Sequence, residues 1–328
     1  MNNGIPMVVN PKEDHVIIVA PVEQVVVASY IQDPWDRWSQ ETRKALEEKQ
    51  QQAREDPKMF DGPLVRVNQI KVNGKEVILY LQRTSYFPFV ITRGNVGNHE
   101  EWLVPPDDCA NPLSIGGLTV TIEDEAEYLL WLGRKNPKAN ELGGGQYHIS
   151  PAGYVNPERD FSYITSDYRE RLEEMLCYRP LPADSILQSN LDRELPHMLR
   201  REPFELGSRI LYQAPFAIVD RYSLRNPMIA ILSLIDIKSD EILGGFRAHH
   251  QLYKMFGKEH GIRAPEFDTM EPVEFTWKAI KEFYEEHLEE LRPHARAALQ
   301  ALLMNWDTAA GRLEEAYSRR RALESTNL

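Results

Sequence analysis

Apolar clusters separated by polar segments divide the first part of the chain into expected strands and one expected helix. Two β-branched runs, 16–20 and 25–30, are typical of buried strands. The segment 35–55 follows a proline and is rich in Glu, Gln, Lys and Arg, which predicts a solvated helix. The chain is therefore expected to begin with a β-rich module that contains one polar helix.

A second pair of apolar runs, 64–72 and 76–82, lies on either side of Asn73-Gly74. Both central residues of a type I′ turn need a positive φ, which Asn and Gly adopt readily. The pattern therefore predicts a β-hairpin with Asn73 and Gly74 at its turn.

The remainder of the chain contains further apolar runs and a mainly helical segment at about 273–322. Five runs are expected to be strands: 118–122, 128–132, 147–150, 209–219 and 228–237. Because strands and helices are interspersed, we expect an α/β (α+β) fold with a mixed sheet flanked by helices and a helical C-terminus.

The distribution of loops suggests three domains. A loop-rich passage with several glycines and prolines ends near residue 108. We expect an N-terminal module at 1–108, a central domain at 109–260 and a helical extension at 261–328.

Charge and cysteine content narrow the classes of function. The chain has 328 residues and a formal net charge of -12, which disfavours general nucleic-acid binding because an acidic surface repels phosphates. Cys109 and Cys177 lack metal-ligand spacing, so neither a disulfide framework nor a zinc site is indicated. No segment has the pattern of a signal peptide or a membrane span, and we expect a cytoplasmic protein.

The central stretch carries a glycine loop after a pair of expected strands. The second of these strands ends near Arg134, and Gly153 lies in a loop that continues to Glu158. Residues 118–237 resemble the Nudix superfamily, in which such a loop leads to a helix with the motif Arg-Glu-aliphatic-any-Glu-Glu. The resemblance implies that Arg134 and Gly153 contact the ligand and that Glu158 is an acidic group near the metal.

One candidate for the motif helix is Arg193-Glu194-Leu195, which two expected strands follow directly, as the Nudix fold requires. Its arginine lies 40 positions after Gly153 (193 minus 153), far beyond the family spacing. His197 and Met198 stand where the family has two metal-binding glutamates, and a thioether is a poor ligand for magnesium. We favour this segment because of the strands that follow it.

The other candidate is the segment Arg169-Glu170-Arg171-Leu172-Glu173-Glu174, which has the arginine and all three glutamates at the family spacing. Offsets of three and four place these carboxylates on one side of a helix. However, Arg171 stands where the family has an aliphatic residue, and no expected strand follows directly. Both alternatives therefore stay open.

The family typically cleaves a nucleoside diphosphate linked to another group, with the help of a divalent metal. For the Arg169 segment, the resemblance implies that Glu173 and Glu174 hold Mg²⁺ or Mn²⁺ and that Glu170 is a base or a further ligand. The resemblance also implies a further acidic ligand from a later loop, and Asp240 or Glu241, after the last expected strand, would be this additional metal ligand.

For the Arg193 segment, Arg193 would contact the ligand and Glu194 would be the remaining acidic residue of the motif. We would then expect a catalytically inactive ligand sensor or protein-interaction module. Under both alternatives the expected partner is a small nucleotide derivative, and a homodimer or a protein partner stays open.

The N-terminal module has a resemblance of its own. The residues Phe60-Asp61-Gly62-Pro63-Leu64 and the run 81–86 are similar to the extension that precedes some larger Nudix proteins, including those acting on nucleotide sugars. A simpler interpretation is a small β-rich module that packs against the rest of the chain.

Overall fold

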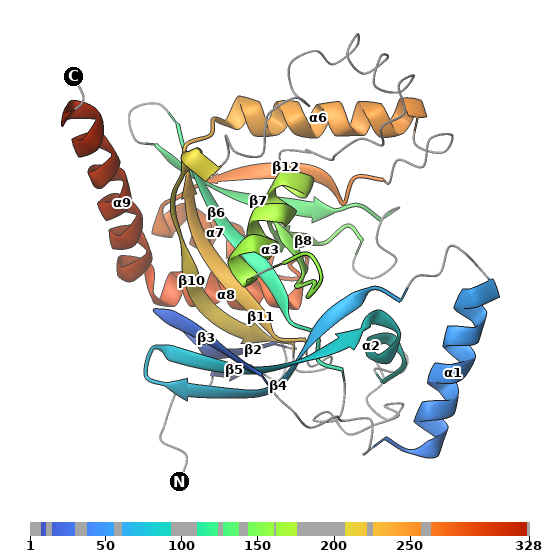
Figure 1. The fold of residues 1–328 in the computed structure, drawn as a ribbon. Coiled ribbons are helices and arrows are strands. Elements are labelled where there is room, and N and C mark those ends of the chain that lie inside the picture. Colours follow the sequence, from blue (N-terminus) through green and yellow to red (C-terminus); the bar gives the residue numbers. More distant parts are fainter. Residues whose placement is uncertain are drawn as a thin grey trace. The chain divides into compact units, whose positions relative to one another are not determined.

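The chain has the mixed α/β architecture that the sequence predicts, with helices flanking a mixed sheet (Figure 1). The computed structural model describes residues 8–10, 15–29, 38–55, 61–92, 110–123, 127–137, 144–160, 162–175, 207–221, 226–256 and 264–326. Among these residues, no helix is both long and apolar enough to cross a membrane.

The strands are β1 (Val8–Asn10), β2 (His15–Val19), β3 (Gln24–Ser29), β4 (Pro63–Asn73), β5 (Glu76–Ser85), β6 (Ser114–Ile122), β7 (Tyr128–Lys135), β8 (Tyr147–Ile149), β9 (Ala152–Tyr154), β10 (Ile210–Asp220), β11 (Met228–Ile235) and β12 (Phe267–Glu274). The helices are α1 (Gln40–Glu55), α2 (Tyr86–Thr92), α3 (Tyr163–Glu170), the π-helical turn η5 (Arg171–Met175), α6 (Ser239–Phe256), α7 (Trp277–Glu286), α8 (Pro293–Met304) and α9 (Trp306–Thr326).

The larger sheet has the strand order β1-β2-β10-β11-β6-β7-β12, with β8 paired to β7 and β9 paired to β6. A smaller sheet has the order β3-β5-β4. All of the expected strands are therefore confirmed, as is the helical character of the C-terminal part.

The residues group into two compact units, each made of segments that are distant in sequence. Unit 1 comprises Met1–Ile115, Gly153–Ser166 and Pro215–Ala230, and unit 2 comprises Gly116–Ala152, Asp167–Ala214 and Ile231–Leu328. The division into 1–108, 109–260 and 261–328 stays a prediction.

Within unit 1, the predicted hairpin forms as β4 and β5, but its turn differs by one residue. Asn73 pairs with Glu76, so the two turn residues are Gly74 and Lys75. Gly74 has a φ of 63°, whereas Lys75 does not have a positive φ. The prediction of a type I′ turn at Asn73-Gly74 is therefore wrong: a positive φ at the first turn residue alone is typical of type II′.

The motif Phe60-Asp61-Gly62-Pro63-Leu64 includes a residue that supports α2, a helix the sequence did not predict. Asp61 accepts a hydrogen bond from the Phe87 backbone N–H at 2.7 Å and another from the Ser85 hydroxyl at 2.9 Å. A carboxylate at the start of a helix satisfies backbone donors that have no partner within the helix.

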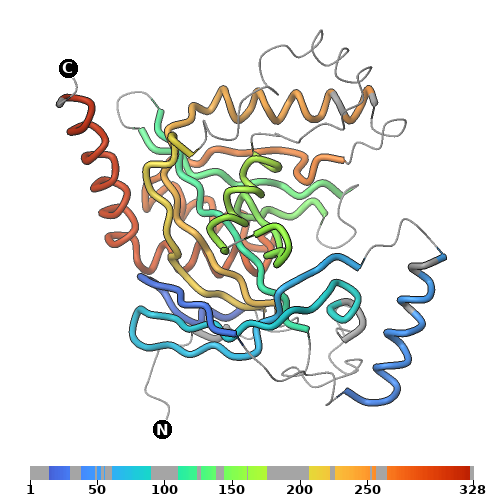
Figure 2. Tube along the Cα trace, viewed as in Figure 1, coloured from blue at the N-terminus to red at the C-terminus, as the bar shows by residue number. Residues whose placement is uncertain are grey.

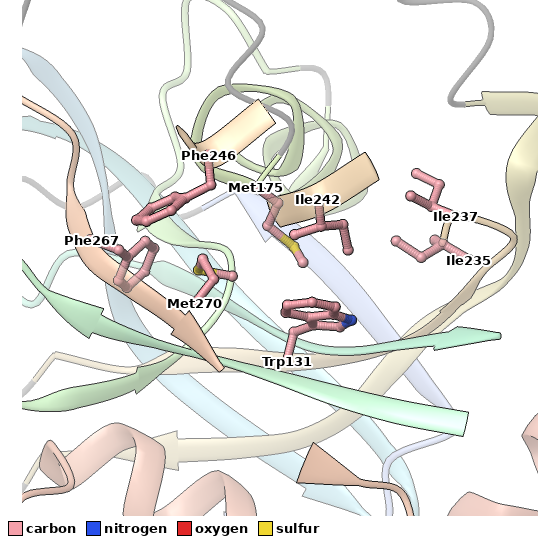
Figure 3. Packing of buried hydrophobic residues seen from close by; sticks show 8 residues of the cluster. All are labelled: Trp131, Met175, Ile235, Ile237, Ile242, Phe246, Phe267 and Met270. Atoms are coloured by element: carbon pink, nitrogen blue, oxygen red, sulfur yellow. The ribbon is translucent and has the colours of Figure 1, made fainter. Parts of the chain in front are cut away.

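Within unit 2, helices cover both faces of the strands around β7. On one face, α6 and η5 enclose a buried cluster that contains Trp131, Met175 and Phe267 (Figure 3). On the other face, Tyr147 of β8 packs edge-on against Phe283 of α7, with ring centroids 5.2 Å apart. Successive residues of a strand point to opposite faces, so this double coverage accounts for the burial of consecutive residues in β7.

Strand β12 was not predicted from the sequence. It pairs with β7, which lies more than a hundred residues earlier in the chain, and so brings the start of the C-terminal part beside β7 (Figure 2). The two strands pair antiparallel, with Phe267 opposite Lys135 and an irregularity between Phe267 and Thr269. Pro272 lies within β12, and β12 ends the strand order of the described sheet, a position where proline is tolerated. The proline and the irregular register obscured this strand in the sequence.

Close packing between β7 and β12 makes Gly133 a sensitive position. A Cβ atom there would lie 2.4 Å from Cδ1 of the buried Phe267 ring. We expect Gly133→Ala to lower the free energy of unfolding by about 1–3 kcal/mol through overpacking. Urea denaturation measures this change.

Gly311→Ala is the matched control, because a Cβ at Gly311 in α9 would meet nothing within 4 Å. Alanine is the better helix former, so this variant should be neutral or more stable. Equal destabilisation of both variants would contradict the packing of β12 on β7.

Candidate functional site

The segment with all three motif glutamates forms α3 and η5, and its position in unit 2 depends on Arg171. The Arg171 and Asp167 side chains are fully buried and pair through Nη2 and Oδ2 at 2.6 Å. Arg171 also donates hydrogen bonds to Thr119 Oγ1 of β6 and, at 3.0 Å, to Ser233 Oγ of β11. Gln213 of β10 donates to Asp167 Oδ2 at 2.5 Å. The segment is therefore joined to three strands of the larger sheet.

The same contacts explain the departure from the family motif at Arg171. The family motif has an aliphatic residue where Arg171 stands. Here Arg171 is buried against the sheet, where Asp167 pairs with it and two hydroxyl groups accept its hydrogen bonds. The departure at Arg171 is thus compatible with a helix packed on the strands.

The alternative segment with Arg193 and Glu194 lies outside the described residues, together with His197 and Met198. The sequence-based preference for that segment stays a prediction.

The three motif glutamates of the Arg169 segment lie in the same region of unit 2. Arg169 Nη1 contacts Glu170 Oε1 at 2.6 Å and Glu173 Oε1 at 3.9 Å. Glu174 accepts a hydrogen bond from the Ala152 backbone N–H at 2.8 Å, which links η5 to the residue before Gly153. Glu170 and Glu174 are buried, whereas the Glu173 side chain is 31% exposed.

Two further charged residues that the sequence did not indicate complete the group. Lys135, the last residue of β7, contacts Glu266 Oε1 at 2.5 Å and Glu174 Oε1 at 3.7 Å. Glu266 immediately precedes β12, and the pairing of β12 with β7 brings it to Lys135. Predicting this contact would have required predicting β12. We call Glu170, Glu173, Glu174 and Glu266 the carboxylate cluster.

Burial and mutual repulsion shift the pKa values of these carboxyl groups in opposite directions. Burial raises the pKa of Glu174 well above its usual range, and the neighbouring Glu266 reinforces this shift against the opposing effect of Lys135. Burial also acts on Glu266, but Lys135 and a hydrogen bond with Glu174 lower its pKa to about 2. Glu174 therefore holds the shared proton, and Glu266 is the ionised partner of Lys135.

Glu170 is also affected by its surroundings. Burial raises its pKa to about 7, with contributions from Glu173 and Glu266 that Arg169 partly offsets.

The other predicted site residues have different surroundings. Arg134 donates to the Gly145 carbonyl at 2.7 Å, pairs with Glu290 at 2.8 Å and lies over the Tyr147 ring. Since Arg134 and Lys135 are neighbours on a strand, they point to opposite faces of β7. Lys135, and not Arg134, is the basic residue at the carboxylate cluster.

The remaining predicted residues have other contacts. Glu241, in the first turn of α6, forms a two-point ion pair with Arg209 at 2.7 and 2.9 Å. In unit 1, Gly153 is the middle residue of β9, and Glu158 is exposed in a turn where its backbone N–H donates to Asn156. Their assignment to ligand or metal binding stays a prediction.

The carboxylate cluster has the chemistry of a hard-cation site, because carboxylate oxygens are preferred ligands of Mg²⁺ and Mn²⁺. As the side chains stand, no three His, Cys, Asp or Glu residues in the described part of the chain converge closely enough to hold a metal. Arg169 forms ion pairs with Glu170 and Glu173, and Lys135 forms ion pairs with Glu174 and Glu266. A metal ion would therefore compete with these two protein cations for the same oxygens.

Comparisons with known proteins give little further information. No family model matches the chain, and no curated protein matches it. A similar solved structure is a Nudix hydrolase from M. smegmatis, RenU, which is 11% identical over 60% of this chain and 86% of that chain, with a TM-score of 0.30. At this TM-score the two backbones differ too much for the match to bear on function.

The buried pair of Arg171 and Asp167 predicts a non-additive mutational effect. Asp167→Leu leaves a buried guanidinium without its carboxylate, and we expect a loss of about 3–5 kcal/mol in the free energy of unfolding. Arg171→Leu should cost a similar amount, whereas the double variant should recover much of the loss because no unpaired charge remains. Denaturant unfolding of all four proteins forms the test.

The exposed pair of Lys278 and Glu282 provides the control cycle, with an expected coupling of about 0–1 kcal/mol. Additive losses at residues 167 and 171 would show that the two side chains do not interact.

The raised pKa of Glu170 predicts a pH-dependent stability. The pKa rises from 4.5 to about 7 on folding, so the unfolded chain releases this proton at a lower pH than the folded chain. The contribution of Glu170 to stability therefore falls as pH rises from about 4.5 to about 7, by up to about 3 kcal/mol.

Glu170→Gln removes this titration. The free energy of unfolding of the variant, relative to that of the wild type, should therefore be higher at pH 8 than at pH 5. Chemical denaturation at the two pH values measures the difference. An identical pH dependence in both proteins would rule out the shift at Glu170.

Proposed function

We propose that the chain is a Nudix-type hydrolase that uses the carboxylate cluster and a divalent cation to cleave a nucleoside diphosphate derivative. The observation that carries this proposal is the grouping of Glu170, Glu173 and Glu174 on a segment that packs on the sheet through Arg171. Glu266 adds a fourth carboxyl group that the motif alone does not provide.

The charge balance of the cluster also supports a cation. With the proton held by Glu174, the other three carboxyl groups and the two cations Arg169 and Lys135 leave one negative charge when Glu170 is ionised. The exposed part of Glu173 makes the Arg169 end of the cluster accessible. A divalent ion there would compensate the excess charge without further burial of protein groups.

The chain's residues take the following roles in this proposal. Glu173 is a metal ligand, and Glu170 is a base or a further ligand. Arg169 positions the Glu170 and Glu173 side chains, and the Ala152 backbone N–H positions Glu174. A bound divalent ion would supply charge neutralisation at the diphosphate and a site for the attacking water.

A second candidate function is metal-independent binding of a nucleotide derivative. The contacts of Lys135 with Glu174 and Glu266 favour it, because a protein cation already neutralises part of the cluster. Such a protein would recognise its ligand without hydrolysing it.

Hydrolysis assays with a panel of nucleoside diphosphate derivatives in Mg²⁺ or Mn²⁺ distinguish the two functions. We expect metal-dependent release of a nucleoside monophosphate, and a loss of roughly 100-fold or more in kcat for Glu173→Gln and Glu170→Gln. Glu282→Gln on α7, whose side chain is 65% exposed, is the matched control and should keep wild-type activity.

The variant Glu194→Gln separates the two motif segments. Under the proposed function it should retain activity, whereas loss of activity in Glu194→Gln alone would favour the Arg193 segment. If no member of the panel is hydrolysed but nucleotides raise the melting temperature in a chelator, the binding function replaces hydrolysis.

A further inference from the structure

Lys135 has an unusual environment for a lysine side chain. Only 2% of the side chain is exposed, and the ammonium group lies between the Glu266 and Glu174 carboxyl groups at 2.5 and 3.7 Å. The ammonium also lies 4.1 Å from the centroid of the Phe267 ring, which attracts a cation through its π face. The pairing of β7 with β12 fixes both Lys135 and Phe267, so the site of the ammonium is set by the sheet.

We infer that Lys135 is a positioning residue whose ammonium takes the place of a metal ion at the Glu174 and Glu266 end of the carboxylate cluster. This inference rests on the proposed metal site. Glu174 and Glu266 are held by Lys135, which leaves the Glu170 and Glu173 end for a divalent ion.

The physical reason is competition for the same oxygen atoms. Glu266 Oε1 cannot accept a hydrogen bond from the ammonium at 2.5 Å and ligate a metal ion along the same direction. A metal ion on the Glu174 and Glu266 oxygens would also repel the buried ammonium at short range. Because β7 holds Lys135 in the interior, the ammonium cannot move into solvent without breaking the packing around Phe267.

The burial of Glu174 also explains why a cation is needed at this end of the cluster. Glu174 and Glu266 share a hydrogen bond, and an ionised carboxylate in a buried environment is costly without a nearby positive charge. The Lys135 ammonium supplies this charge from within the protein, so the Glu174 and Glu266 side chains are held without a metal ion.

Removal of the ammonium should therefore strengthen metal binding. In calorimetric titrations of the metal-free full chain with MnCl₂, we expect Lys135→Met to lower the dissociation constant by roughly 10- to 100-fold or to add a second site, because the repulsion between the ammonium and the metal ion is lost. A purely structural role for Lys135 would predict weaker binding, because the cluster would lose its order. Unchanged or weaker binding in Lys135→Met overturns the inference.

Two further variants make the test specific. Lys281→Met removes a partly exposed lysine on α7 that pairs with Glu285, and its Mn²⁺ affinity should equal that of the wild type. The double variant Lys135→Met with Glu266→Gln removes a freed ligand together with the lysine, so its affinity should fall back toward the wild-type value. A double variant that binds as tightly as Lys135→Met would overturn the role assigned to Glu266.

The readout is independent of turnover, so it separates this inference from the proposed function. If Lys135→Met gains Mn²⁺ affinity while no nucleotide derivative is hydrolysed by the wild type, the inference stands and the hydrolase proposal fails. If Lys135→Met unfolds in a chelator, far-UV circular dichroism should show refolding on addition of MnCl₂. Failure to refold at saturating Mn²⁺ overturns the inference.

Discussion

The buried ion pair of Arg171 and Asp167 is the interaction on which the candidate site depends. It joins η5 to the strands through Thr119, Ser233 and Gln213, so the direction in which the neighbouring glutamates point follows from it. A buried pair of charges is an expensive way to attach a helix, since an aliphatic residue would suffice. Its advantage is directional, because hydrogen bonds fix the rotation of the segment about its axis more strictly than apolar contacts do.

Charge neutralisation is the second constraint, and it links two distant parts of the sequence. The carboxylate cluster combines residues of the α3 and η5 segment with Glu266, and Lys135 is the cation between them. The antiparallel pairing of β7 with β12 makes this meeting possible. The electrostatics of the site thus depend on the strand pairing, because a change in the β12 register would move Glu266 away from Lys135.

The sequence predicted the fold where local pattern determines structure. The hairpin of β4 and β5, the fully buried β6 and the C-terminal helices follow from periodicity and turn residues, although the turn itself lies one residue later than expected. Strand β12 escaped prediction because Pro272 and an irregular register interrupt its alternation. The contact between Glu266 and Lys135 was not predicted either, because it depends on the pairing of β12 with β7.

Arg171 illustrates another limit of sequence patterns. A charged residue at an aliphatic position indicates exposure or a broken motif, whereas here a partner one helical turn earlier, Asp167, allows the charge to be buried. Pattern matching treats residues one at a time and does not detect such compensation. The three motif glutamates themselves were predictable, because their spacing along one segment is a local property.

The position of Pro272 in β12 has a consequence for association between molecules. β12 ends the strand order of the described larger sheet, and its exposed positions carry Asp268, Thr269, Pro272 and Glu274. A proline lacks the backbone N–H that an added strand would need, and the two acidic side chains would repel an identical strand from a second molecule. This edge of the described sheet is therefore a poor template for the addition of another strand.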